Sequence, residues 1–447
     1  MRIHSAVFDD FPPFRSDAEI LFPPKPPGSQ LGEVQFLVGG NGSGKTRLLS
    51  LFCAACGNRS SLSMRLPAET QLQAAVIAET DGTFGIWSDR KNYCGWLKQG
   101  DALPSRTEMI SGTDRPELTT HGFAFDLAGG GGFGKGGQSV SPPQSRFAMA
   151  FSGTNVMNDE VVEALKPVSM GKKNEHLVLK STDPDTLKAI AQSLVNLKMT
   201  AAMDAMQGSG QVSRCMRMVA RLEEAISNIT GRSFAITVTH HPKVNLKVVW
   251  GNSPPMLMVQ VPDGLRAILG WLAAAVARLN AEFPDHQDPL SLPVVVLIDE
   301  PEAHLHPKWQ RYVLPALQRL LPNSQIIAAT HSAFVISSVN EGWIHILQPG
   351  DEGAVRIEAA RPCGRGDSHL DVVEDILGVT EWYDPETEGE LVRFRKLRDM
   401  VITAKGDGKD ELDELAASIA SRSEALNDIM GREMAKVSRH LQKAATP

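Results

Sequence analysis

The 447-residue sequence is poor in cysteine, has no excess of positive charge and contains no long apolar run. Its five cysteines show no paired spacing, which suits the reducing environment of the cytoplasm. The formal net charge of −7 gives no overall basic surface, so nucleic-acid binding is possible but is not supported by net charge. No apolar run is long enough to cross a membrane, and the alternating first eight residues predict a strand rather than a secretion signal. These absences favour a cytoplasmic protein with no membrane partner.

The most informative segment that is present is glycine-rich and spans residues 39–46. It fits the phosphate-binding pattern G-x-x-x-x-G-K-[ST], follows an apolar run at 34–38 and precedes a predicted helix. Glycines let successive backbone N–H groups point at phosphate oxygens, and the helix N-terminus adds partial positive charge. Lys45 is expected on the β and γ phosphates, and the Thr46 hydroxyl on Mg²⁺. The residues expected to bind ATP here are Gly39, Asn41, Gly42, Ser43, Gly44, Lys45, Thr46 and Arg47.

A second segment, residues 293–300, is an apolar run that ends in two acids. The continuous β-branched residues predict a strand buried on both faces, as in a parallel sheet. Asp299 would then emerge at the carboxyl end of the strand, where open α/β sheets bind ligands, and is expected to hold Mg²⁺ directly or through water. Glu300 is the predicted catalytic base that polarises the attacking water.

A third segment, residues 324–332, is another apolar strand that ends in polar residues, among them His331. A single histidine is more often structural than functional. This one, however, follows the acid-bearing strand by one predicted helix, at about 308–321, which places it on a neighbouring strand close to the γ-phosphate. A neutral imidazole there could hydrogen-bond the phosphate or the attacking water, so His331 is the second predicted catalytic residue.

Together these segments resemble the ABC-type ATPases, and more narrowly the soluble branch related to RecF, SMC and the overcoming-lysogenization-defect proteins. The resemblance is carried by residues 39–46, by the string DEPEAHLHP at 299–307 and by residues 329–332. It implies that ATP binds between two heads of a homodimer or higher oligomer, with the segment after Glu300 crossing the interface.

Members of this branch also need a signature loop that opens a helix and covers the ATP of the opposite subunit. The candidate is residues 261–269, in which Asp263 is expected to cap the helix and Gly264 to approach phosphate. Pro262 stands where the usual serine would be, and an ordinary capped helix is the alternative interpretation. No glutamine can be assigned to the Q-loop, for which the expected place is residues 151–153.

The predicted fold class is α/β: a P-loop ABC-type ATPase head with an antiparallel β subdomain, an inserted helical lid and a C-terminal helical tail. Two runs flanking Asp81-Gly82 predict a β-hairpin of the β subdomain. About 250 residues separate the phosphate loop from Asp299, which indicates a substantial insertion. The head is expected at 1–370, with 157–255 as the lid and the strands leading to the signature, and the tail at 371–447.

The tail carries apolar helical stripes, Leu412 with Leu415 and Ile419, and Leu426 with Ile429 and Met430. These stripes are equally consistent with a helical cap on the core and with a docking platform for another protein. No nuclease constellation is visible in the sequence, and no acidic cluster marks a further catalytic domain after His331.

The resemblance extends to ATPase components of bacterial anti-phage systems, Septu-type and retron-associated, whose effector nuclease is a separate chain. It implies an ATP-hydrolysing switch that dimerises head to head and controls a separate effector protein, such as a nuclease. A DNA-repair or DNA-structure-sensing ATPase is the alternative. A transporter ATPase subunit is less favoured, because the signature is degenerate and the DEPEAHLHP string differs from that of transporters.

Overall fold

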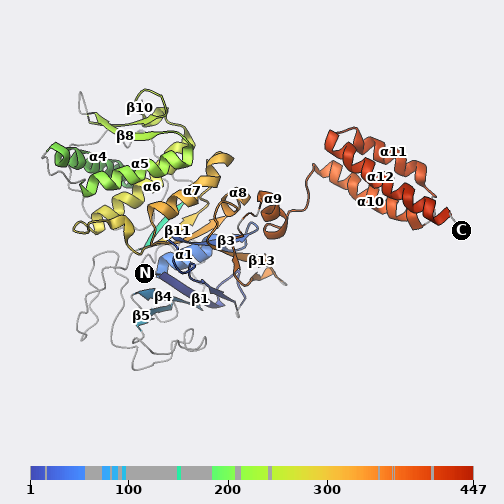
Figure 1. The fold of residues 1–447 in the computed structure, drawn as a ribbon. Helices are drawn as coiled ribbons and strands as arrows, with labels where there is room; N and C mark the ends of the chain where they lie inside the picture. The colour runs from blue at the N-terminus through green and yellow to red at the C-terminus, as the bar shows by residue number, and fades with distance from the viewer. Residues whose placement is uncertain are drawn as a thin grey trace. The chain divides into compact units, whose positions relative to one another are not determined.

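The computed structural model describes most of the chain, with several gaps, and divides it into two compact units. The units are Met1–Val372 and Val373–Pro447, each treated below by itself (Figure 1). The predicted Q-loop beyond Ser152, the first part of the predicted lid and the Asp81-Gly82 turn lie outside the described residues. The described residues are 2–15, 18–55, 73–80, 83–88, 93–96, 148–152, 184–206, 213–239, 244–350, 353–364, 366, 368–403 and 407–445.

A seven-stranded sheet forms the centre of the first unit and confirms the predicted α/β class. Its parallel strands are buried on both faces, which is why they read as continuous apolar runs in the sequence. Short strands β14 (Val355–Ile357) and β15 (Arg361–Pro362) pair antiparallel with β13 at one side. The parallel strands, in spatial order, are β13 (Trp343–Pro349), β3 (Glu33–Gly39), β12 (Gln325–Thr330), β11 (Val295–Asp299) and β7 (Ala148–Ser152).

A second, antiparallel sheet lies against one face of the first and confirms the predicted β subdomain. Strands β4 and β5 pair in the predicted hairpin register, with Thr80 opposite Thr83. Stacked rings of Phe8, Phe11 and Phe14 fill part of the core beside α1 (Lys45–Ala55). The strands of this sheet, in spatial order, are β2 (Glu19–Leu21), β1 (Arg2–Asp10), β4 (Gln73–Thr80), β5 (Thr83–Ser88) and β6 (Tyr93–Trp96).

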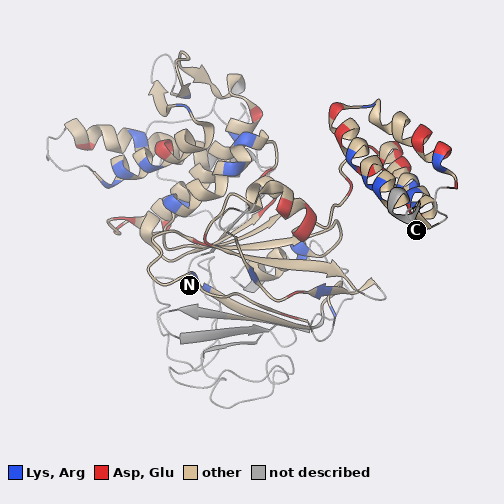
Figure 2. Ribbon diagram, turned by 45° about the vertical axis from the view of Figure 1, so that its right-hand side comes forward, with Lys and Arg blue, Asp and Glu red and all other residues tan. Residues whose placement is uncertain are grey.

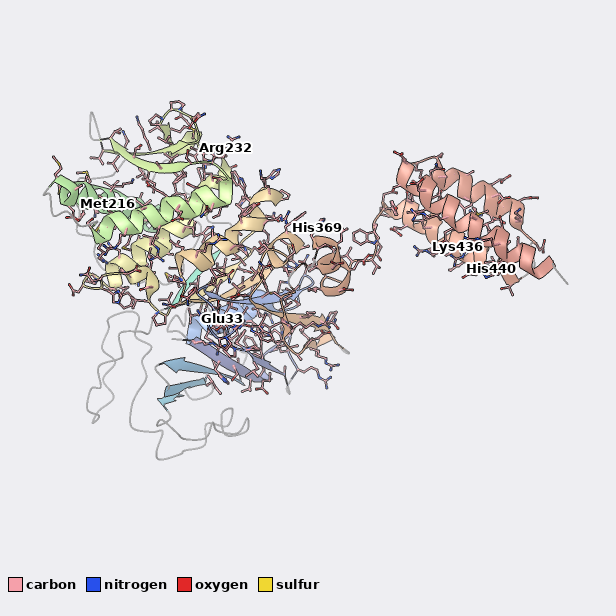
Figure 3. All side chains as sticks on the ribbon, in the orientation of Figure 1. Glu33, Met216, Arg232, His369, Lys436 and His440 are labelled. Atoms are coloured by element: carbon pink, nitrogen blue, oxygen red, sulfur yellow. The ribbon has the colours of Figure 1, made fainter. Side chains whose placement is uncertain are left out.

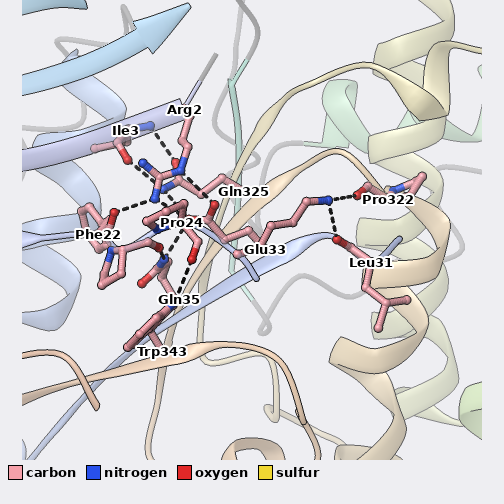
Figure 4. Close-up of polar contacts among 12 residues, drawn as sticks. Arg2, Ile3, Phe22, Pro24, Leu31, Glu33, Gln35, Pro322, Gln325 and Trp343 are labelled. Carbon is pink, nitrogen blue, oxygen red and sulfur yellow. Dashed lines mark hydrogen bonds and ion pairs between the residues drawn. The ribbon is translucent and has the colours of Figure 1, made fainter. Parts of the chain in front are cut away.

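A buried polar cluster joins the first strand of the chain to the central sheet (Figure 4). The side chain of Gln325 takes the place of a strand partner, because it accepts from Ile3 N at 2.7 Å and donates to Ile3 O at 2.8 Å. Glu33 receives Arg2 Nε at 2.9 Å and Gln35 Nε2 at 2.7 Å. The partners of these polar groups are protein atoms, so their burial leaves the main donors and acceptors satisfied.

His345 completes this cluster from β13. Its Nε2 lies 2.8 Å from Gln35 Oε1, and since the amide nitrogen of Gln35 already donates to Glu33 and Pro23, the imidazole is the donor in this contact. Burial lowers the pKa of His345 from 6.5 to about 4. The ring is therefore neutral in the folded protein at neutral pH.

The described part of the lid is built from helices α4 (Pro184–Met206) and α5 (Arg214–Thr230) and a small antiparallel sheet. Ser213 caps α5 at its start, and Gly231, with φ of 68°, ends it. Two arginines of α5 bind the carboxyl ends of neighbouring helices. Arg214 donates to the carbonyl of Phe283 at 3.0 Å, and Arg221 donates to the carbonyl of Leu320 at 2.6 Å. The small sheet consists of β8 (Phe234–Thr239), β9 (Asn245–Trp250) and β10 (Met256–Leu257).

Helices α6 (Asp263–Glu282), α7 (Pro307–Leu320) and α8 (Ala333–Ile336) complete the first unit beside the sheet. Helix α7, expected at about 308–321, contains Pro315 in its interior. The ring of Phe334 on α8 stacks on His369 of α9 (His369–Asp371), with centroids 5.1 Å apart; His369 is labelled in Figure 3. No helix in the described ranges is both long enough and apolar enough to span a membrane.

The second unit is a three-helix bundle with its own core. Its helices are α10 (Pro385–Thr403), α11 (Lys409–Ala420) and α12 (Glu424–Ala445). The predicted stripes pack on one another: Leu412, Ile419 and Met430 are buried. Basic and acidic residues both occur along the helices of the bundle (Figure 2).

The cross-links of the bundle set the direction of its first and last helices. Arg422 donates to Thr387 at 2.6 Å, and Arg398 donates to Glu433 at 2.6 Å. Both links join residues 35 apart, so α10 and α12 run parallel. The exposed apolar side chains of this unit include Val392 and Met400 on α10.

The depressed pKa of His345 predicts a loss of stability in mild acid. Between pH 6.5 and about 4 the unfolded chain binds a proton on this histidine and the folded chain does not, so the free energy of unfolding falls as the pH drops through that window. The full effect is about 3 kcal/mol. Urea unfolding of the wild type and of His345→Gln, which keeps a donor for Gln35, should show this component only in the wild type. Identical pH dependence in both proteins would contradict the assignment.

Candidate nucleotide-binding site

The phosphate loop lies between β3 and α1, as its motif predicts. Gly42 and Gly44 have φ of 80° and 89°, a conformation that favours glycine. At Gly44 a Cβ would lie 2.6 Å from the ring of Phe14, so a side chain there would also clash. Gly39 is equally restricted, because a Cβ there would meet the carbonyl of Leu347 and, at 2.8 Å, Ser43 Oγ. The loop therefore depends on glycine for its shape at these positions.

Lys45 is the buried cation of this loop. Its Nζ donates to the carbonyls of Gly39 at 2.8 Å and Gly40 at 3.0 Å, and lies 3.4 Å from Ser43 Oγ. Burial lowers the pKa of Lys45, while the nearby Asp299, Glu300 and Glu302 act in the opposite direction. The three acids come from the segment that the sequence analysis placed opposite the loop, so the fold brings these two motifs together.

The other predicted residues of the loop differ in their surroundings. Ser43 is buried, Asn41 is exposed, and Thr46 is half-buried in the first turn of α1. Arg47 donates from Nη1 to the carbonyl of Pro12 at 2.7 Å. The guanidinium of Arg47 therefore has a structural partner, and its predicted contact with nucleotide would have to share or replace that bond.

Asp299 and Glu300 stand at the carboxyl end of β11. Asp299 pairs in register with Ala329 on one side and with Ser152 on the other. Ser152 belongs to the segment where the Q-loop was expected, which places that segment beside the acidic pair. Glu300 is exposed and has φ of 53°, a conformation uncommon for a residue with a side chain, and its N–H donates to Ala329 O at 2.8 Å. The strand thus ends sharply at Glu300.

His331 follows the neighbouring strand β12 and is half-buried. Burial lowers its pKa and the charge of Lys45 lowers it further, whereas Glu300 acts in the opposite direction. The imidazole is therefore neutral at pH 7, as the predicted role requires. The electrostatic coupling of His331 to both Lys45 and Glu300 places the histidine in the same cluster.

Glu302 is a residue of this cluster that the sequence analysis did not assign. Its Oε1 accepts from the backbone N–H of His331 at 2.8 Å. Burial raises its pKa, and Glu300 raises it further, against hydrogen bonds that lower it. The available signal in the sequence was a third acid, two residues beyond Glu300 in the same string.

The predicted capping of α6 by Asp263 is wrong. Asp263 does not cap α6 with its side chain: the helix begins at Asp263, the N-cap residue is Pro262, and the cap makes no side-chain hydrogen bond. Proline has no side-chain acceptor, and the Asp263 carboxylate is turned to Arg266 instead. Hydrogen bonding and charge from Arg266 hold the pKa of Asp263 below its usual value.

Gly264 is required for packing within the head. A Cβ at this position would lie 2.7 Å from the carbonyl of His304 and 3.2 Å from the ring of Trp309. Trp309 in turn meets Trp250 of the lid edge to face, with centroids 5.8 Å apart. The signature candidate therefore packs against the chain that follows Glu300. A contact of Asp263 or Gly264 with phosphate remains a prediction.

Removal of the Lys45 ammonium should strongly weaken ATP binding, because the β and γ phosphates lose a buried cation. Calorimetry with a non-hydrolysable ATP analogue should show strong binding to the wild type and at least a 100-fold loss, on the order of 3 kcal/mol, in Lys45→Ala. Lys25→Ala, which removes an ammonium bonded to Leu31 O on the far side of β3, is the matched control. Equal affinity in wild type and Lys45→Ala would refute the phosphate-loop assignment.

Part of the chain is similar to known proteins. Residues 165–337 match the family described as "AAA domain, putative AbiEii toxin, Type IV TA system". The chain is 28% identical over 130 residues to "Retron Vc95 probable ATPase" of Vibrio cholerae serotype O1 biovar El Tor, which covers 29% of this chain and 25% of that protein. It is 30% identical over 108 residues to "Septu protein PtuA" of Bacillus thuringiensis, which covers 24% of this chain and 27% of that protein.

The matched part thus spans about a quarter of each of these relatives. Among solved structures, "Crystal structure of the SmcHead bound to the C-winged helix domain of ScpA" aligns over 81% of this chain and 98% of that chain, with 12% identity and a TM-score of 0.43. The matched segments are thus similar to the AAA domain of that family and to parts of the retron and Septu ATPases.

Proposed function

We propose that the protein is an ATP-binding and ATP-hydrolysing switch that pairs head to head with a second copy and controls a separate effector in anti-phage defence. The observation that carries the proposal is the single cluster of Lys45, Asp299, Glu300 and His331 at the carboxyl ends of β3, β11 and β12. This cluster supplies a cation, a metal-binding carboxylate, a base and a neutral imidazole in one place.

Binding of ATP begins at the phosphate loop. The Nζ of Lys45, which now donates to the carbonyls of Gly39 and Gly40, would donate to phosphate oxygens instead. The backbone N–H groups of the loop and the start of α1 favour the same negative charge. The burial of Lys45 also strengthens the interaction, since fewer waters screen the ammonium.

Thr46 and Asp299 fit the ligand preference of Mg²⁺. A hydroxyl and a carboxylate are hard oxygen donors, and the ion usually completes its shell with phosphate oxygens and water. When bound, Mg²⁺ would neutralise charge on the β and γ phosphates.

The remaining residues handle the proton and the attacking water. Glu300 is exposed at the end of its strand, so its carboxylate can reach a water molecule and accept its proton. Neutral His331 has one ring nitrogen that donates and one that accepts, so it can hold the water or the γ-phosphate in line. The fold supports this division, because burial and Lys45 keep the imidazole unprotonated.

Pairing of two heads would bring the signature of one copy to the ATP of the other. The side chain of Asp263 is 69% exposed and is therefore available to a second copy. An aspartate would repel a triphosphate, but its ion pair with Arg266 neutralises that charge. The Asp263–Arg266 ion pair therefore makes this signature, which lacks the usual serine, compatible with a nearby phosphate.

The apolar stripes of the tail are not its docking surface, because they form the core of the bundle. The bundle has its own core, so its stripes are covered within the unit. Val392 and Met400 remain exposed on α10, 44% and 58% respectively, among charged side chains. We propose that this face of α10 contributes to binding of the effector.

Glu300→Gln should separate binding from hydrolysis. Glutamine keeps the size of the side chain but cannot take a proton, so ATP should bind with near wild-type affinity while turnover falls by about 100-fold or more. The measurements are phosphate release and analytical ultracentrifugation with ATP, in which this variant should accumulate as a dimer. His331→Ala should also slow turnover with little change in binding. A parental rate in Glu300→Gln would exclude Glu300 as the base.

Deletion of residues 385–447 should leave nucleotide binding intact but abolish co-purification with the product of the neighbouring gene. The deletion removes the three helices of the bundle together, so it should not expose the core of the head. Val392→Ser with Met400→Ser in the full chain should weaken the same interaction while the bundle stays folded by circular dichroism. Retention of the partner by the truncated chain would place the docking surface elsewhere.

A further inference from the structure

The side chain of Glu302 ties the loop after β11 to the turn after β12. Its Oε1 accepts from His331 N at 2.8 Å. The Oγ1 of the fully buried Thr330 accepts from Ser332 N at 3.0 Å. Two consecutive amides that follow β12 are thus held by side chains, and the His331 amide is held by the Glu302 carboxylate.

The turn formed by His331 and Ser332 has a further restraint, which acts on the Ser332 side chain. Ser332 Oγ donates to Gln310 Oε1 at 2.6 Å, and Gln310 Nε2 donates to Leu305 O at 3.0 Å. Both restraints therefore end on the segment that follows Glu300. The main chain that carries His331 is fixed to the same segment that carries the proposed base.

A carboxylate is a costly acceptor at this position. Glu302 Oε2 is buried and has no hydrogen-bond partner among the described residues. Burial also raises the pKa of the group, and the charge of Glu300 acts in the same direction. A buried unpaired oxygen lowers stability, so the contribution of Glu302 to folding alone does not account for a charged side chain here.

The same burial argues against Glu302 as a second base. One of its oxygens is bonded to His331 N and the other is enclosed by protein, whereas the Glu300 side chain is exposed. A base must reach the water whose proton it takes. Glu302 therefore acts on the reaction through the residue that it holds.

We propose that Glu302 is a positioning residue, which fixes the main chain at His331 so that the imidazole stays beside Lys45 and Glu300. This inference rests on the proposed function, because it assigns to Glu302 the placement of the proposed catalytic histidine. A displacement of about 1 Å in a catalytic group can lower a rate by about 100-fold, so loss of this anchor should be visible in turnover.

The first experiment measures the anchor itself and does not depend on hydrolysis. Hydrogen exchange of the His331 amide should be at least about 10-fold faster in Glu302→Ala than in the wild type, because this amide loses its acceptor. Glu302→Gln should stay near the wild type, since its amide oxygen can still accept. The matched control is Glu341→Gln, which removes a carboxylate that accepts from Ser29 Oγ at 2.6 Å near the opposite end of the sheet. Unchanged exchange in Glu302→Ala would overturn the inference.

The second experiment is a double-mutant cycle in ATP turnover. Glu302→Ala should lower kcat by about 10-fold or more with the affinity for an ATP analogue within about 2-fold, and Glu302→Gln should restore most of kcat. If Glu302 acts through His331, the double variant with His331→Ala should be no slower than His331→Ala alone. Multiplied losses in the double variant would overturn the proposal, as would a parental kcat in Glu302→Ala.

Further variants keep the outcomes separable. If Glu302→Ala fails to fold, Glu302→Met fills a similar volume without an acceptor for the His331 amide, and the cycle and the exchange measurement are repeated with it. Absence of hydrolysis by the wild type would refute the proposed function, whereas the exchange of the His331 amide would still decide whether Glu302 anchors the turn.

Discussion

The shared register of the parallel strands is the constraint on which the candidate site depends. Val38 on β3 pairs with Thr330 on β12, and Ala329 on β12 pairs with Asp299 on β11. The three strands therefore end within one or two residues of each other, although they come from distant parts of the chain. The phosphate loop, the acidic pair and the histidine each begin where a strand stops. A slip of one residue in any of these pairs would turn the side chains to the other face.

The buried polar cluster holds the antiparallel sheet at the amino ends of these strands. Gln325 begins β12 and Glu33 begins β3, so the groups that hold Arg2 and Ile3 sit at the amino ends of the strands whose carboxyl ends form the site. Neutral His345 belongs to the same layer through Gln35. One set of strands thus carries a closed, satisfied polar network at one end and an open set of donors and acceptors at the other.

Local sequence signals predicted much of this arrangement. The apolar runs before residue 39, before Asp299 and before His331 all form buried strands, since continuous β-branched sequence is typical of a sheet covered on both faces. The Asp81-Gly82 pair predicted the flanking hairpin, whose strands do pair, with Thr80 opposite Thr83. These features depend on short stretches of chain, which is why sequence alone could predict them.

Features that depend on contacts between distant segments were not predicted. The sequence could not show that Gly264 is needed where His304 approaches, 40 residues further along the chain. It offered no reason to choose Glu302 over its neighbours, because the bond to His331 joins residues 29 apart. The stripes of the tail were visible, but only the bundle shows that they cover one another.

The stack of Phe334 on His369 has a consequence for the connection between the two units. Phe334 stands three residues after His331, and the first unit ends at Val372, three residues after His369. The last residues of the first unit therefore follow a ring, His369, that stacks on Phe334. A rotation of α8 must either move His369 with it or separate the two rings. The stack therefore connects the segment that follows β12 with the last residues of the first unit.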